Sequence, residues 1–204
     1  MNFKEISILL LISGLTLNSC KNTKNEEKIT TANASNEIKD ENTRLIENNN
    51  SKSDADDNLA PLIADYINNK FLKPADKKVM SEIDKKFSMH QSDLNNDGQK
   101  EVFVYLNSPY FCGTGGCTIL LLSPNQELIT KFTVTNPPIF IEPTFKNDWK
   151  ILTVKSEGEW KELLNINGSY PSNPTVLDKA SYDAPSGHAE IAFDEKENLK
   201  FYKF

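Results

Sequence analysis

Several features are scarce in this chain of 204 residues, and each scarcity excludes a class of protein. Histidine occurs only as His90 and His188, so a zinc site beside the cysteines would lack partners. The net charge is −6, with no basic stripe for nucleic acid and no polybasic segment for anionic lipid. The sequence has no internal repeat, and no apolar run after residue 20 is long enough to span a bilayer.

Residues 1–20 have the layout of a bacterial export signal. A polar start with Lys4 leads into an apolar run over residues 6–17, which is shorter than the ~20 residues of a membrane-spanning helix. Its end, Leu17-Asn18-Ser19-Cys20, resembles the lipobox of bacterial lipoproteins. The resemblance implies a signal peptide over residues 1–19, and acyl chains such as palmitate on Cys20 that anchor the protein in a membrane. The alternatives are an ordinary signal peptide with an incidental cysteine, or an uncleaved anchor.

The segment from Cys20 to residue 57 has the composition of a tether. It contains no aromatic residue, and Asn, Lys, Glu, Ser and Asp dominate it. Such a chain buries too little apolar area to offset its conformational entropy, so we expect it to be disordered. Its stretch Lys24-Asn25-Glu26-Glu27 resembles acidic signals that sort lipoproteins to the outer membrane, although a solvated linker is the other interpretation. We therefore expect a lipid-anchored cell-envelope protein, on the periplasmic or surface face of the outer membrane.

Residues 58–204 are long enough for one folded domain, and its first part has helical periodicity. Apolar residues at spacings of three and four predict one buried helix face, made by Leu59, Leu62, Ile63, Tyr66 and Ile67. Asn58 is the expected N-cap, with Pro61 in the first turn. A second helix is predicted over residues 74–83, with a face made by Val79, Met80 and Ile83.

The rest of the domain has the periodicity of short strands joined by turns. Glu101 to Leu106 is apolar on both faces, which predicts a central strand, whereas Ile139 to Ile141 is flanked by prolines, which predicts an edge strand. The other predicted strands are 87–92, 118–122, 127–135, a hairpin of 149–155 with 160–166, and a final pair, 188–193 and 199–204, joined by a polar turn. This pattern predicts an α+β domain, an antiparallel β meander or small sandwich with one or two N-terminal helices.

Residues 93–101 form the most specific internal motif. Oxygen-bearing side chains at alternate positions, with a glycine for the sharp turn, are typical of calcium loops. An EF-hand is excluded, because its twelfth position is Val104 rather than a glutamate. The motif resembles a single FG-GAP or integrin-type calcium loop, which implies side-chain ligands from Asp93, Asn95, Asp97 and Glu101 and the backbone carbonyl of Gln99. A structural calcium ion and a plain Asx-rich turn are both open interpretations.

The glycine-rich stretch from Phe111 to Cys117 holds the two cysteines that remain when Cys20 is lipidated. Because lipoproteins mature outside the reducing cytosol, we expect a structural disulfide between Cys112 and Cys117. A redox-active pair would usually have closer spacing, and a backbone anion nest is a further alternative. Together with the motif at 93–101, this loop resembles a pairing over residues 87–123 in uncharacterised secreted bacterial proteins, which implies no activity.

Catalytic residues are hard to identify. Ser186, His188 and Asp183 are close in sequence, but triads are recognised by geometry and this spacing is not that of a known one. We interpret these three residues as structural. An aromatic binding surface could form from Trp149, Trp160, Tyr170 and Tyr182, although Trp on strands is more often part of a core.

The sequence therefore favours a non-enzymatic binding domain presented on a lipid-anchored tether, with an unidentified protein or cell-wall ligand. A second hypothesis is an inhibitor of a cell-wall hydrolase, such as a lysozyme, that inserts loop 107–117 or 167–187 into the enzyme's cleft. A hydrolase with an unrecognised site is the third. Calcium is the one cofactor expected.

Overall fold

The structure, a computed structural model, describes residues 57–194, 196 and 198–204. The expected signal peptide, the lipidation site Cys20 and the expected tether up to residue 56 lie outside the described residues. Within the described part of the chain, no helix combines the length and the apolar character needed to cross a membrane.

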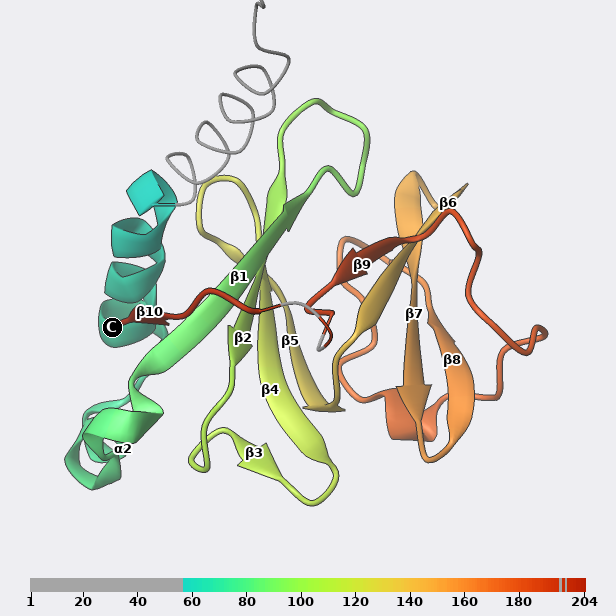
Figure 1. The fold of residues 1–204 in the computed structure, drawn as a ribbon. Helices are drawn as coiled ribbons and strands as arrows, with labels where there is room; N and C mark the ends of the chain where they lie inside the picture. The colour runs from blue at the N-terminus through green and yellow to red at the C-terminus, as the bar shows by residue number, and fades with distance from the viewer. Residues whose placement is uncertain (1–56, 195, 197) are drawn as a thin grey trace, which may run out of the picture. The chain divides into compact units, whose positions relative to one another are not determined.

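The described residues form three layers, a helix and two antiparallel sheets, as Figure 1 shows. The helical layer begins with residues 57–66, which continue into the π-helical turn η1 (Ile67–Phe71). After it come the short helix α2 (Pro74–Val79) and the 3₁₀ turn η2 (Glu82–Asp84). The expected α+β class, a small antiparallel sandwich with N-terminal helices, is confirmed.

The first sheet is the middle layer. Its strands pair along the path β10-β1-β2-β4-β3, in which β2 and β3 pair with the same edge of β4, and β5 pairs with the opposite edge of β4. The strands are β1 (Lys86–Ser92), β2 (Glu101–Leu106), β3 (Cys112–Gly113), β4 (Gly116–Leu122), β5 (Leu128–Thr135) and β10 (Tyr202–Lys203). All six residues of β2 are buried, which confirms the predicted central strand.

The second sheet packs on the face of the first sheet that is turned away from the helix. Its strands run in the order β8-β7-β6-β9. They are β6 (Ile139–Lys146), β7 (Trp149–Ser156), β8 (Glu159–Leu163) and β9 (Glu190–Ala192), and a 3₁₀ turn, η3 (Pro174–Val176), lies in the long connection from β8 to β9.

Two apolar clusters hold the layers together, one on each face of the first sheet. Between the helix and the sheet lie Ile63 and Ile67 of the helical layer against Val104 and Leu120 of the strands. Between the sheets, Phe103 and Phe132 of the first pack with the inner face of the second. Burial of apolar surface on this scale is the main source of folding free energy.

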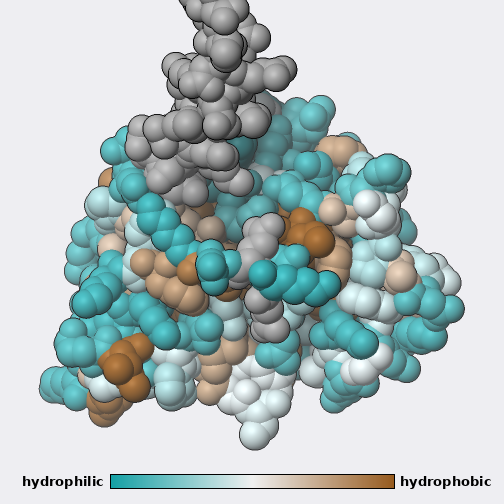
Figure 2. Space-filling view, in the orientation of Figure 1, coloured by the Kyte–Doolittle hydropathy of each residue, from teal (hydrophilic) through white to brown (hydrophobic). Residues whose placement is uncertain are grey.

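The helical predictions need three corrections. Asn58 is itself helical rather than the N-cap, and Leu62 is 53% exposed, so it does not belong to the buried face. The second helix ends at Val79, because the Asp84 carboxylate caps a new turn by accepting the N–H and hydroxyl of Ser81. Val79 and Ile83 are consequently exposed, at the corner of the molecule around α2 where Figure 2 shows hydrophobic atoms.

Two strand predictions are wrong. Residues 139–141 are central rather than at an edge, because β6 pairs with β7 on one side and with β9 on the other. The register shifts between Ile141 and Phe145, so Pro143 lies at an irregular point of the ladder, where a missing N–H is tolerated. The last two strands do not pair with each other either, since β9 joins the second sheet and β10 joins β1 of the first.

The glycines near Cys117 are required by close packing. A Cβ on Gly115 would lie 2.3 Å from Cγ1 of Val134, and one on Gly116 would lie 2.6 Å from the backbone of β5. Val134 itself has a φ of 52°, where the β4–β5 ladder shifts register. These contacts give the glycine-rich stretch a structural explanation that needs no bound anion.

Candidate functional site

The loop that follows β1 is organised by its own polar side chains. The Asp93 carboxylate accepts the N–H of Gly98 (3.0 Å), and Asn95 Oδ1 accepts the N–H of Asp97 (3.0 Å). Asp97 Oδ1 in turn accepts the N–H of Gln99 (2.7 Å). Gly98 has a φ of 84°, a conformation that glycine adopts at little cost. These bonds curl residues 93–99 into a compact turn.

Glu101, the first residue of β2, connects the end of this loop to its beginning. Its side chain is 1% exposed, and Oε2 accepts the N–H of Leu94 at 2.8 Å. Burial raises the pKa of Glu101, and the negative charges of Asp97 and Asp93 raise it further. The Oδ1 atom of Asp93 is buried without a hydrogen-bond partner. The loop therefore gathers three carboxylates and leaves one of their oxygens unsatisfied.

The expected calcium ligands are only partly arranged as a site. Asn95 Nδ2 donates to Asp97 Oδ2 at 3.0 Å, so these two side chains are engaged with each other, and Asp97 and Gln99 are exposed. Within the described residues, no group of three or more histidine, cysteine, aspartate and glutamate side chains lies close enough together to hold a metal ion. The sequence motif and its hydrogen bonds thus fit an Asx-rich turn as they stand.

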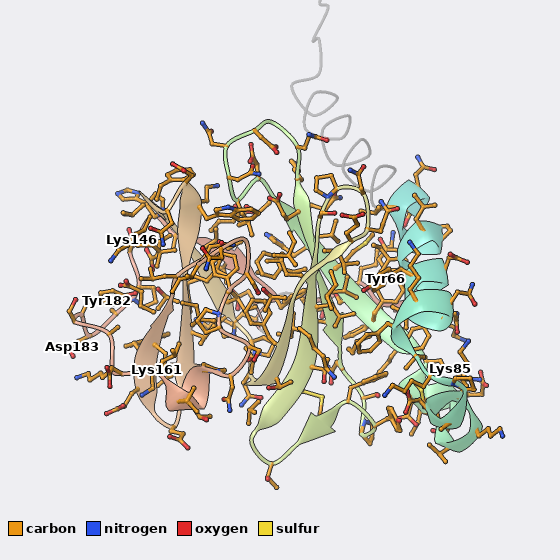
Figure 3. All side chains as sticks on the ribbon, turned by 180° about the vertical axis from the view of Figure 1, so that it is seen from behind. Tyr66, Lys85, Lys146, Lys161, Tyr182 and Asp183 are labelled. Carbon is orange, nitrogen blue, oxygen red and sulfur yellow. A yellow bond between two sulfur atoms is a disulfide. The ribbon has the colours of Figure 1, made fainter. Side chains whose placement is uncertain are left out.

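A second site lies on the outer face of the second sheet. A cleft of about 320 Å³ opens between strands β6 to β8 and the loop 181–186, and Figure 3 shows Tyr182 and Asp183 on this loop. The loop is fixed beside β8, because Ala180 donates its N–H to the carbonyl of Trp160 at 2.7 Å. The residues lining the cleft are Glu142, Thr144, Ile151, Glu162, Ser181, Tyr182, Ala184 and Ser186.

Two glutamates face this cleft from different strands. Glu142 of β6 is 7% exposed, and its two oxygens share one donor, the N–H of Ser186, at 3.4 and 3.2 Å. Glu162 of β8 lines the cleft together with Tyr182, whose hydroxyl shares a hydrogen bond with Thr153 Oγ1 at 2.7 Å.

The cleft is electrostatically negative. Burial raises the pKa of Tyr182, and the nearby charges of Glu162 and Glu142 raise it further. Within the described residues, neither glutamate forms an ion pair with a lysine, arginine or histidine. The cleft thus presents two carboxylates without a countercharge.

Ser186, His188 and Asp183 do not form a triad. Ser186 Oγ accepts the backbone N–H of His188 at 3.2 Å, which is a turn contact rather than a contact with the imidazole. Asp183 pairs with Lys179 at 3.1 Å on the exposed side of the loop. Of the three, Ser186 alone lines the cleft.

The four aromatic residues singled out in the sequence do not share one surface. Tyr170 is buried between the sheets, where its ring meets Trp149 edge-on and its hydroxyl donates to the carbonyl of Lys150 at 2.7 Å. Trp160 lies on the outer face of the second sheet, packed edge-on against Phe140. Tyr182 is therefore the one that lines the cleft.

The two cysteines are bonded, as expected. Cys112 and Cys117 are directly opposite each other on β3 and β4, with Cα atoms 3.9 Å apart. Between them, residues 113–115 form an exposed tip. The disulfide thus closes a short hairpin that projects from the end of the first sheet (Figure 1).

A histidine and a glutamate connect the two sheets. His90 on β1 lies 2.8 Å from Oε1 of Glu190 on β9, and Ser92 donates its hydroxyl to Oε2 at 2.7 Å. The hydrogen bond with His90, followed by that with Ser92, lowers the pKa of Glu190 to about 2 although burial opposes the shift. The carboxylate lies between its two partners, so the arrangement is a structural link and not a relay to a nucleophile.

Comparisons with known proteins found no match, so the functional proposal rests on the geometry of the site. No family model matches the chain, and neither a curated protein nor a solved structure matches it.

Sequence reasoning missed Glu142 and Glu162. One local signal was present, since alternation with buried Ile141 and Leu163 places each glutamate on the outer face of its strand. The loop that completes the cleft begins nearly twenty residues after Glu162, and no sequence pattern connects the two.

Proposed function

We propose that the protein is a lipid-anchored cell-envelope protein, and that its folded domain binds a ligand through the outer-face cleft of the second sheet. The lipobox-like sequence ending at Cys20 and the tether-like composition up to residue 57 support the anchor. The observation that carries the binding role is the cleft itself, with Glu142 and Glu162 facing it and no countercharge beside them. Two neighbouring carboxylates without an opposite charge repel each other, and a ligand that neutralises them offsets this cost.

The anchor is tested by fractionating cells that express the wild type or Cys20→Ala. Wild-type protein is expected in the membrane fraction with the added mass of its acyl chains. The variant is expected to lose both, because two or more chains are needed for stable anchoring. Equal mass and equal membrane association of the two forms would contradict lipidation at Cys20.

The binding role is tested by pull-down from intact envelopes, with Glu142→Gln/Glu162→Gln as the matched variant. A ligand of the cleft is captured by the wild type and lost from the variant. Glu127→Gln removes one charge from an exposed position of the first sheet's turn and serves as the control. Capture that is equal with all three proteins would place the ligand elsewhere on the molecule.

The loop at 93–101 is proposed to hold a structural calcium ion. Its unsatisfied Asp93 Oδ1 and the buried Glu101 beside two aspartates support this proposal, because calcium takes carboxylate oxygens and would relieve their repulsion. With a Kd of ~10⁻³ M, 10 mM calcium would stabilise the fold by about 1.4 kcal/mol.

Thermal unfolding with and without calcium tests this ion. The wild type is expected to melt at a higher temperature in 10 mM calcium than in 10 mM magnesium. Glu101→Gln is expected to lose this response while melting no lower than the wild type in chelator, since it removes a repelled charge and keeps an acceptor for the Leu94 N–H. An unchanged melting temperature up to 10 mM calcium would leave the loop as a plain turn.

A second candidate function is inhibition of a cell-wall hydrolase. The disulfide-closed hairpin with its exposed tip at residues 113–115 favours it, because a preorganised projecting loop loses little entropy on entering an enzyme cleft. Lysozyme activity measured with micromolar purified protein tests the idea. Inhibition that disappears on reduction of Cys112–Cys117 would support it, and undiminished lysis would exclude it for that enzyme.

A further inference from the structure

We propose that the cleft on the second sheet takes a guanidinium or ammonium group carried on an aliphatic stem, the chemistry of an arginine or lysine side chain. The inference rests on the proposed binding role of this cleft and specifies its ligand class. Glu142 and Glu162 hold the positive group, while Ile151, Ala184 and Tyr182 contact the stem.

The positions of the two glutamates suit one cation between them. They lie on β6 and β8 with β7 in the middle, and Glu162 is opposite Phe140, two residues before Glu142, so their backbones are about 12 Å apart and a cation fits between the two side chains. Their side chains face the same cleft and both act electrostatically on Tyr182. A planar guanidinium offers several N–H donors in different directions, which can meet two carboxylates at once.

The glutamate oxygens have capacity left for such donors. Glu142 is buried, yet its two oxygens share the single N–H of Ser186 at 3.2 and 3.4 Å, both long for a charged acceptor. Glu162 lines the same cleft and forms no ion pair among the described residues, so its oxygens can accept donors from a ligand. Both carboxylates therefore have acceptor capacity left.

The size and lining of the cleft select against other ligands. Its volume of about 320 Å³ is at the small end of the range for ligand sites, ~300–1,000 Å³, so it suits a single side chain better than an extended glycan. The lining supplies two carboxylates and no histidine or cysteine, which is fewer side-chain ligands than a protein usually gives a metal ion. The apolar side chain of Ile151 and the ring of Tyr182 suit the methylene stem of a basic side chain.

Calorimetric titration of the purified full chain in detergent tests the inference. The probe is the peptide acetyl-Gly-Arg-Gly-amide, and its counterpart carries citrulline, which has the same shape without the charge. The arginine peptide is expected to bind and the citrulline peptide to bind at least tenfold more weakly, because the neutral group loses the charge-assisted hydrogen bonds to the two carboxylates. Equal binding of the two peptides, or binding of neither, would overturn the inference.

The affinities of three variants for the arginine peptide test whether it binds in the cleft. Glu162→Gln is expected to weaken the arginine peptide about tenfold, and Glu142→Gln/Glu162→Gln to abolish its binding. Glu127→Gln is the charge-matched control and leaves affinity unchanged. Because Glu142 also holds the loop at Ser186, the melting temperature of each variant is measured, and Glu162→Gln alone decides the outcome if the double variant unfolds. Full affinity in a folded Glu162→Gln would overturn the assignment.

Competition with free L-arginine separates two sources of the same chemistry. Displacement at equal concentration points to a small guanidinium compound, and a much weaker effect of the free amino acid points to a side chain within a polypeptide. The envelope pull-down keeps this inference distinct from the proposed function. Capture that depends on Glu142 and Glu162, together with failure of the arginine peptide, would retain the binding role and reject the ligand class.

Discussion

The two sheets of this domain differ in how many of their faces are covered. The first sheet has the helix on one face and the second sheet on the other, and β2 is buried along its whole length. The second sheet is covered on its inner face by the first, and on its outer face, among the described residues, loop 181–186 borders a cleft. The side chains of the first sheet are therefore held by packing on both faces, whereas side chains on the outer face of the second sheet border a cleft.

The two sheets also differ in how their carboxylates are used. The first sheet has one buried carboxylate, Glu101 of β2, and its oxygen is used within the fold to accept the N–H of Leu94. On the second sheet Glu142 and Glu162 instead face an open cleft, where a ligand can reach them, and this accessibility favours binding as their role. Four measurements can test this contrast.

The largest expected difference in the free energy of unfolding is between alanine substitutions of two phenylalanines, one on each sheet. Phe103→Ala on β2 removes a fully buried ring between the sheets and should lower the free energy of unfolding by about 3–5 kcal/mol. Phe140→Ala on the outer face of β6 removes a half-buried ring and should cost only about 1 kcal/mol. Urea unfolding measures both. Similar losses would mean that the outer face is as tightly packed as the core.

The disulfide hairpin belongs to the first sheet, and we expect it to contribute less to the free energy of unfolding than the core of that sheet does. Replacing both Cys112 and Cys117 by serine is expected to cost about 2 kcal/mol, because the bond closes a short loop. The urea midpoint of the wild type in reductant should move to that of the variant. A variant that loses nothing would show that the β3–β4 pairing and the glycine contacts hold the hairpin without the bond.

The stability contributed by Glu190, which connects the two sheets through His90 and Ser92, should depend on pH. The pKa of Glu190 in the folded protein, about 2, is lower than its ordinary value, 4.5, so its stabilisation is complete above pH ~4.5 and is lost as the pH falls toward 2. Because the side chain is partly exposed, Glu190→Gln should cost about 1 kcal/mol at pH 6.

Urea unfolding between pH 2 and 7 measures this link, with Glu127→Gln as the control. The stabilities of the wild type and Glu190→Gln should converge at the acid end, while the control should run parallel to the wild type. A constant difference over the whole range would indicate that Glu190 acts by packing and not by charge.

The smallest effect is expected at Leu62, on the solvent side of the helix. Leu62→Ala should change the free energy of unfolding by less than about 0.5 kcal/mol, whereas its neighbour Ile63→Ala should cost about 2–5 kcal/mol. Thermal and urea unfolding of the two variants give the comparison. A large loss at Leu62 would show that this side of the helix is covered in the folded protein.

The local parts of the fold could be predicted from the sequence because their signals are local. The apolar run of β2 indicated burial on both faces, and turn residues marked the hairpin of β7 with β8. The disulfide followed from two cysteines close in sequence in a glycine-rich loop. The motif at 93–101 predicted a tight turn with alternate polar side chains, and the hydrogen bonds have this pattern.

The rest could not be predicted, because it depends on pairing between distant segments. Residues 139–141 have prolines on both sides, and only the return of β9 makes their strand central. The cleft needs Glu142, Glu162 and Tyr182 from three separate segments, none of which has a recognisable motif. Leu62 fits a helical spacing as well as Ile63 does, and the direction in which the helix packs decides between them.

The late return of β9 and β10 has a consequence for biosynthesis. β1 is made more than a hundred residues before its outer neighbour β10, and β6 must wait in the same way for β9. While the chain is being translated, these strands have unpaired edges, which are prone to pair with other chains. Phe204 also packs against Phe87 of β1, so this edge is covered only after residues 202–204 have been made.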